Sequence, residues 1–182
     1  MSDILLYFKQ YLKSRRESDD DDDLSLYIDD LETILEETNM TSFILRMHDY
    51  LHEKTIVRTR FEQLTKEEET FLFCSNVITL IDLHGFQDAF LTFYSWLQPA
   101  SEAALRSIGA DKASNIFSKA YRLVSGISEL SIKERHQFIK KRTHRSFAAE
   151  FEALSQEYTN CQAETKELLY RYAHNNSKHF HR

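Results

Sequence analysis

Glycine and proline are almost absent from this chain, and their scarcity constrains its fold more than any other feature. The 182 residues include three Gly and one Pro, where average usage would give roughly a dozen and about nine. Sheets need many tight turns built from these residues, whereas long helices joined by short polar connections do not. The sequence therefore predicts an all-α fold, which we expect to be one compact domain over residues 1–182 with about seven to eight helices.

Apolar residues recur at helical spacing, and local signals mark where helices begin and end. Thr65 opens a capping box that Glu68 closes, which predicts a helix start. Gly85 and Gly109 suit helix C-termini, where glycine can take the left-handed conformation. The helices expected from these patterns cover residues 3–16, 24–37, 41–60, 65–84, 86–97, 99–108, 111–125, a basic stretch from 131 and finally 147–172.

Two segments of the predicted bundle differ sharply in character. Residues 86–97 include five aromatic side chains, so we expect this helix to face water on no more than a narrow strip and to be central. The tail from Asn175 is polar and rich in histidine, and we expect residues 175–182 to fray.

Cysteine use and hydropathy indicate where the protein works. Cys74 and Cys161 lie within helical patterns and form no short-spaced pair, so we expect two buried thiols in a reducing compartment. No segment approaches the roughly 20 apolar residues of a membrane span, and the first residues lack a secretory signal pattern. We therefore expect a cytoplasmic protein with no membrane association.

Charge is unevenly distributed along the chain. The formal net charge is −6, but residues 17–45 contain eleven Asp or Glu and no Lys or Arg. Residues 133–145 carry six Lys or Arg against one Glu, a basic stretch that we expect to be solvated or paired with acidic surface.

The acidic residues of segment 17–45 combine an exposed loop at 17–23 with one face of the predicted 24–37 helix. Acids three or four residues apart on a helix lie roughly 5–6 Å apart, a spacing similar to that of phosphates along one DNA strand. Such a face suits the basic surface of a partner protein. The residues that we expect to contact this partner are Asp19, Asp20, Asp21, Asp22, Asp23, Asp29, Asp30, Glu32, Glu36 and Glu37.

His48 and His52 are the strongest hint of a metal site. Their i, i+4 spacing is that of the histidines on zinc-protease helices, but Asp49 is one methylene shorter than the glutamate of that motif, and a third ligand is missing. We expect exposed helical histidines here. The sequence also lacks a phosphate-binding glycine loop and a recognisable nucleophile with its base. We therefore expect no catalytic residues, no metal and no cofactor, and a protein that is not an enzyme.

Motifs in the second half of the chain go beyond helical periodicity. The run Leu83-His84-Gly85-Phe86-Gln87-Asp88-Ala89-Phe90 is followed by Ala104-Leu105-Arg106-Ser107-Ile108-Gly109-Ala110. This resembles the bacterial DNA-mimic protein family, in which a Gly-Gly-Phe helix start precedes an Ala-Leu…Ile-Gly-Ala element. Later segments 154–158 and 168–172 are similar to two further helices of that family. The resemblance covers residues 65–172.

The resemblance implies an all-helical, often dimeric protein whose acidic surface imitates duplex DNA. Joined with the charge distribution, it leads us to expect a non-enzymatic decoy or inhibitor of a transcription factor or similar DNA-binding protein. An immunity or antitoxin protein that neutralises a cognate toxin or effector is the alternative. Direct binding of nucleic acid is disfavoured, because an acidic surface repels phosphate.

Overall fold

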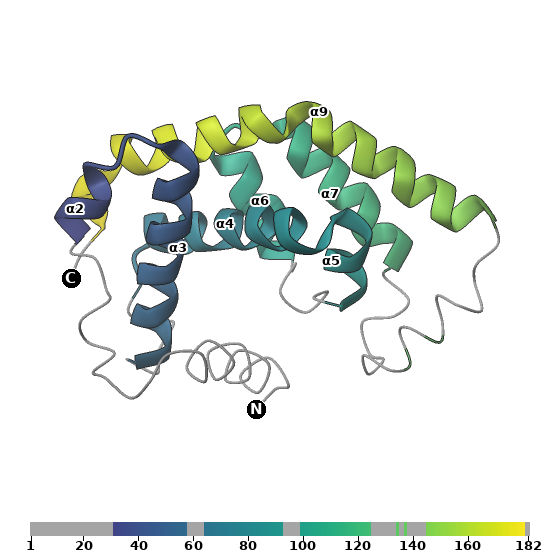
Figure 1. Ribbon diagram of the computed structural model, residues 1–182, viewed down its shortest axis with the longest axis horizontal. Coiled ribbons are helices and arrows are strands. Elements are labelled where there is room, and N and C mark those ends of the chain that lie inside the picture. Colours follow the sequence, from purple (N-terminus) through teal and green to yellow (C-terminus); the bar gives the residue numbers. More distant parts are fainter. Residues whose placement is uncertain are drawn as a thin grey trace.

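The computed structural model describes residues 31–57, 64–92, 99–124, 134, 137 and 145–180. These ranges contain no strand, which confirms the all-α prediction (Figure 1). The predicted 3–16 helix and most of the basic stretch 133–145 lie outside the described residues. The helices are α2 (Leu31–Leu35), α3 (Met40–Val57), α4 (Lys66–His84), α5 (Phe86–Thr92), α6 (Pro99–Ser107), α7 (Asp111–Val124) and α9 (Arg145–Asn175), with a 3₁₀ turn η4 (Ser177–His179).

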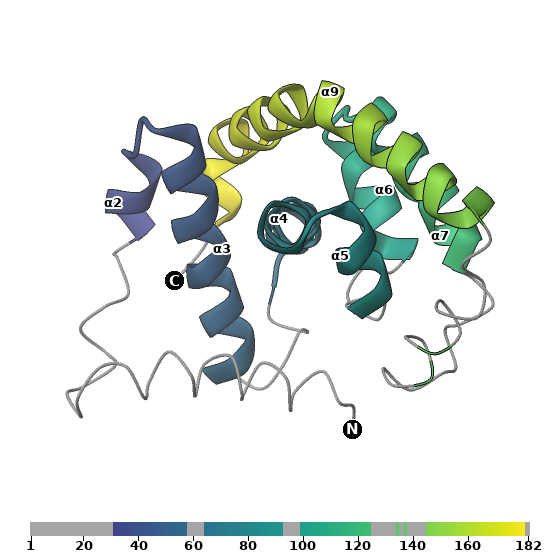
Figure 2. The same cartoon turned by 45° about the vertical axis from the view of Figure 1, so that its right-hand side comes forward.

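Helix α4 occupies the centre of the bundle. Figure 2 shows it end-on, with α3 on one side, α5 and α6 on the other and α9 arching above, and all four contact it. Its side chains are buried around most of its circumference, including Phe71, Cys74, Val77 and Ile78. A helix that is apolar on nearly all sides is stable only inside a core.

The expectation that residues 86–97 form the central helix was wrong for the part that is described. Helix α5 buries Phe86, Ala89 and Phe90 but exposes Gln87 and Asp88; the structure does not describe residues 93–98. Sequence pattern misplaced the centre because α4 carries buried polar residues that read as a solvent-facing strip. Glu68, Ser75 and Asn76 each have a hydrogen-bond partner inside the protein.

Helix α9 is long and curved, and it spans the bundle (Figure 1). Its 31 residues give it a length of roughly 46 Å, and it contacts α3, α4, α5 and α7. Curvature that wraps a helix around a core is typical of long surface helices. The helix extends a few residues beyond both ends of the predicted 147–172 segment.

The C-terminal tail folds back onto the core instead of fraying. The ring of Phe180 is 4% exposed and its centroid lies 6.0 Å from that of Phe71, edge to face. The Thr65 hydroxyl donates a hydrogen bond to the His179 carbonyl oxygen at 3.0 Å. The prediction of a frayed tail was therefore wrong for residues 176–180, because one buried aromatic ring supplies enough apolar contact to hold the turn. Residues 181–182 lie outside the described ranges.

The predicted helix boundaries at Thr65 and Gly85 are confirmed. The Thr65 hydroxyl accepts from the Glu68 N–H at 3.1 Å, and the Glu68 carboxylate accepts from the Thr65 N–H at 2.8 Å. Gly85 has φ 76° and ψ 160°, which is not the left-handed helical conformation that we expected but a region essentially open to glycine alone. This geometry turns the chain sharply from α4 into α5.

Candidate interaction surface

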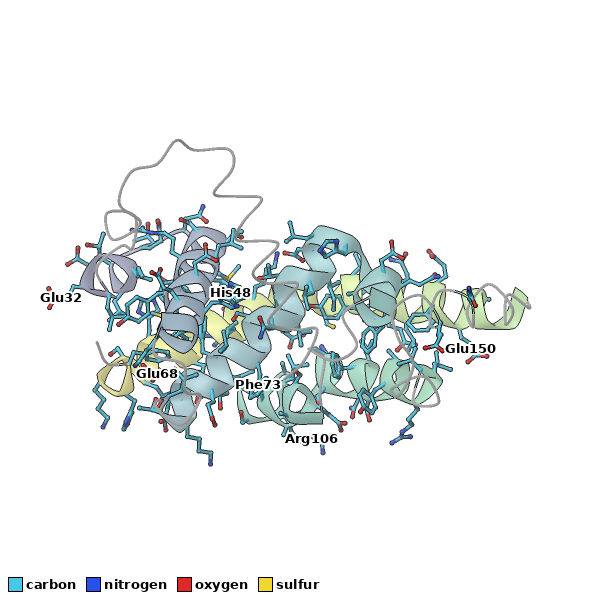
Figure 3. The ribbon with its side chains drawn as sticks, turned by 90° about the horizontal axis from the view of Figure 1, so that it is seen from below. Glu32, His48, Glu68, Phe73, Arg106 and Glu150 are labelled. Carbon is cyan, nitrogen blue, oxygen red and sulfur yellow. The ribbon has the colours of Figure 1, made fainter. Side chains whose placement is uncertain are left out.

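Three of the ten predicted contact residues fall in the part of the chain that the structure describes. Asp19–Asp23, Asp29 and Asp30 lie outside it, as does the predicted 17–23 loop. Glu32 and Glu36 are exposed at helix α2, and Figure 3 shows Glu32 at one end of the molecule. These two residues remain candidates for partner contact.

Glu37 has a structural role at the junction between α2 and α3. Its carboxylate accepts from the Asn39 N–H at 2.8 Å and from the Ser42 hydroxyl at 2.9 Å, and it pairs with Arg46 at 3.2 Å. The Asn39 N–H, the Ser42 hydroxyl and the Arg46 guanidinium together hold the pKa of Glu37 below its ordinary value. Asn39 in turn caps α3, because its side-chain oxygen accepts from the Ser42 N–H at 3.0 Å. Glu37 therefore positions α3 in addition to adding charge.

Acidic residues on α9 are largely matched by cations of the same molecule. Glu164 lies 2.9 Å from Lys112, and Glu157 lies 3.1 Å from Lys119, both on helix α7. On α4, the Asp82 carboxylate lies 2.6 Å from Lys166 of α9 and also accepts from Gln162. Exposed pairs of this kind contribute little stability, but they reduce the net negative field over this surface.

The α4–α5 corner forms a hollow that sequence reasoning did not identify. Its volume is about 320 Å³, and two buried rings belong to it, Phe86 from α5 and Phe151 from α9, with centroids 6.2 Å apart. Asp88 and Glu152 are exposed at its edge. The lining residues are His84, Gly85, Phe86, Gln87, Asp88, Phe151, Glu152 and Ser155. The one sequence signal for this place is the helix break at Gly85.

His48 and His52 are buried between α3 and α4, so the expectation of exposed histidines was wrong. Their rings stack with centroids 5.8 Å apart, and His48 Nε2 lies 2.9 Å from Asn76 Oδ1. Burial, with a further contribution from neighbouring His48, lowers the pKa of His52 to about 3. No group of three or more His, Cys, Asp or Glu in the described residues is arranged to hold a metal ion.

The α3–α4 contact also contains a buried ion pair. Lys54 Nζ lies 2.6 Å from Glu68 Oε1, while Glu68 Oε2 completes the capping box with Thr65. The carboxylate therefore has partners at both oxygens, which is the condition for burying a charge. Together with the His48–Asn76 contact, this pair explains how polar side chains of α4 reach the core.

The two thiols are buried and free, as predicted. Burial raises the pKa of Cys74 far above its ordinary value, and it also raises the pKa of Cys161. Both side chains therefore behave as small apolar core groups and not as reactive thiolates.

The described residues thus define an all-helical protein with exposed acids at both ends and an acid-edged hollow at the α4–α5 corner. Residues 62–176 match the family described as DMP19-like protein. This match covers more than half of the 182 residues, and the chain belongs to the DMP19-like family. Segment 65–172, which resembles the DNA-mimic family, lies inside the matched residues 62–176.

No curated protein and no solved structure matches the chain. No helix in the described ranges is both long and apolar enough to cross a bilayer.

Proposed function

We propose that this protein is a non-enzymatic acidic binding protein that occupies the basic, nucleic-acid-binding surface of a partner protein. Membership of the DMP19-like family over residues 62–176 carries the proposal, because the same segment resembles the DNA-mimic proteins. Its second support is electrostatic: eleven acids and no Lys or Arg in residues 17–45. A partner that binds duplex phosphate presents Lys and Arg, and carboxylates at helical spacing offer them a similar series of charges.

The described acids suit a surface that acts through charge. Glu32 lies exposed on α2 and Glu36 lies exposed directly after it, whereas Glu150 lies toward the opposite end of the molecule (Figure 3). Complementary charge mainly accelerates association and selects the partner. Capture should therefore weaken as salt rises, since exposed charges are screened over roughly 8–10 Å at ordinary ionic strength.

The proposal is tested by affinity capture from the native host, with the captured protein identified and then assayed for DNA binding. We expect a DNA-binding protein that duplex DNA displaces from the complex and whose own DNA binding is inhibited by this protein. Capture of a toxin or effector that duplex DNA does not displace would contradict the proposal and favour the immunity alternative.

A variant tests which acids make the contact. Asp29→Asn, Asp30→Asn and Glu36→Gln remove three charges from the acidic segment, and Glu37 is left unchanged because it holds the α2–α3 junction. The matched control is Glu157→Gln, Glu164→Gln and Glu167→Gln, which removes three charges from acids that are paired within the molecule. Capture should fall for the first variant and persist for the control. Equal loss in both would show that total charge, and not the acidic segment, governs binding.

A further inference from the structure

The C-terminal turn, residues 177–180, and helix α3 share one buried ring near the start of α4. The ring of Phe71 meets Phe180 of the turn with centroids 6.0 Å apart, and it meets Phe43 of α3 with centroids 6.1 Å apart. Both contacts are edge to face, an arrangement that adds to the gain from burial alone. Loss of either neighbour therefore leaves the ring of Phe71 less well packed.

A second link between the turn and α3 passes through the capping box of α4. The Thr65 hydroxyl donates to the His179 carbonyl oxygen at 3.0 Å and accepts from the Glu68 N–H at 3.1 Å. The Glu68 carboxylate in turn lies 2.6 Å from Lys54 Nζ of α3. The turn is therefore connected to the buried ion pair through two side chains at the start of α4.

The turn and α3 both lie outside the residues that match the DMP19-like family. The match covers residues 62–176, whereas α3 ends at Val57 and the 3₁₀ turn η4 spans Ser177–His179. Figures 1 and 2 show the yellow C-terminal end of the chain beside α3. A segment before the match and a segment after it therefore meet at the edge of the family-matched core.

The C-terminal half of α3 is held mainly by polar groups. Of residues 48–54, the buried ones are Leu51 and three polar residues, His48, His52 and Lys54. A buried ion pair adds little net stability compared with apolar packing, because both charges lose their hydration. Segments with few buried apolar contacts open at the lowest cost in free energy. This half of α3 is therefore the part that gains most from an additional hold.

We propose that the C-terminal turn is a strap that holds the C-terminal half of α3 against the start of α4. When Phe180 leaves its place, this half of α3 opens while the family-matched core stays folded. Opening separates Lys54 from the Glu68 carboxylate and exposes a further acid beside Glu67 and Glu69 of the same helix turn. The strap thereby couples the C-terminal end of the chain to the acidic surface of the core.

The test is amide hydrogen exchange measured by NMR on the full chain at pH 7. Phe180→Ala should accelerate exchange of the amides of residues 48–54 by about tenfold relative to those of residues 113–120 in α7. Lys178→Ala, at an exposed position of the same turn, should leave this ratio within about twofold of wild type. Acceleration in α3 that is no larger than in α7, or that is confined to the turn, would overturn the proposal.

A milder variant covers the case in which Phe180→Ala does not fold. Phe180→Leu keeps an apolar side chain of similar size, which buried positions tolerate better than truncation. It should accelerate exchange of the α3 amides relative to those of α7 by about threefold. An unchanged ratio in this folded variant would equally overturn the proposal.

Coupling between two parts of a protein is reciprocal, so loosening α3 must also loosen the strap. The amides of His179 and Phe180 donate to the Asn176 and Ser177 carbonyl oxygens and report on the turn. Lys54→Met should accelerate their exchange by about threefold or more relative to the α7 amides. Lys119→Met, which breaks an exposed pair on α7, should not. Unchanged relative exchange at the turn in Lys54→Met would show that α3 and the turn are independent.

Discussion

Lys54 and Glu68 form an ion pair 2.6 Å long in which the side chains are 6% and 0% exposed. Lys54 belongs to α3, which precedes the family-matched segment, and Glu68 belongs to the first turn of α4, inside it. The pair therefore ties the N-terminal helices to the family core. Its position beside the capping box links the start of α4 to the docking of α3.

Replacing Lys54 with methionine should strongly destabilise the protein. The variant removes the cation while leaving the Glu68 carboxylate buried, and breaking a buried pair on one side costs about 3–5 kcal/mol. Adding Glu68→Gln should recover part of this loss, because glutamine carries no charge and still closes a capping box. Urea unfolding followed by circular dichroism measures both effects.

The control for this pair is Lys119→Met, which removes the cation from an exposed pair with Glu157. It should cost less than about 1 kcal/mol. A Lys54→Met variant no less stable than this control would show that the buried pair is not structurally important.

Helix boundaries followed from the sequence where a local interaction sets them. Thr65 with Glu68 and the helix break at Gly85 lie within a few residues of the features that they control, so their chemistry is visible in the order of residues. The centre of the bundle could not be predicted in this way. Asn76 of α4 is buried because His48 of α3 meets it, and a polar residue whose partner is distant in sequence reads as a surface position.

The candidate site also has features that the local sequence predicts and features that depend on contacts between distant segments. The charge of residues 17–37 is local and visible in the sequence, but the structural role of Glu37 depends on the turn that brings it to Asn39, Ser42 and Arg46. The α4–α5 hollow exists because α9 crosses that corner and brings Glu152 beside Asp88. Helical periodicity does not report a contact between two helices that are distant in sequence, as α5 and α9 are.

Stability should fall on acidification through His52. Its folded pKa is about 3 against an ordinary value of 6.5, so between these values the unfolded chain binds more protons than the folded one. Above pH 6.5 the ring is mostly neutral in both the folded and the unfolded protein, so it does not oppose folding. As pH falls from 6.5 toward 3, only the unfolded chain gains this proton, and the free energy of unfolding should be lower by about 2 kcal/mol at pH 5. Denaturation at pH 7 and pH 5 measures this difference.

His52→Leu removes the titrating group and should reduce the dependence of stability on pH over that interval. His84→Gln, at an exposed position, serves as the control and should retain the wild-type dependence. If wild-type protein and His52→Leu lose equal stability between the two pH values, His52 is not the source of the acid sensitivity.

The docked tail should contribute measurably to stability. Phe180→Ala removes a ring that is 4% exposed and packs on Phe71, and truncating a buried phenylalanine costs about 3–5 kcal/mol. Lys178→Ala, at an exposed position of the same tail, should stay within about 0.5 kcal/mol of wild type. Equal unfolding midpoints for the two variants would mean that the tail does not hold its place in solution.

Glu36 and Glu37 are adjacent acids of the predicted contact surface; the side chain of Glu36 is exposed, whereas that of Glu37 is bound within the α2–α3 junction. Glu36→Gln should leave the melting temperature unchanged and weaken capture of the native partner, because its exposed side chain offers charge to a partner.

Glu37→Gln should lower the melting temperature, because its carboxylate accepts from Asn39 and Ser42 and pairs with Arg46. The pKa of Glu37 is lowered in the folded protein, so its stabilisation is present above its ordinary pKa and is lost as pH falls through the lowered value. The difference in melting temperature between wild type and Glu37→Gln should therefore shrink toward acidic pH, while a difference that is independent of pH would assign the effect to the hydrogen-bond geometry alone.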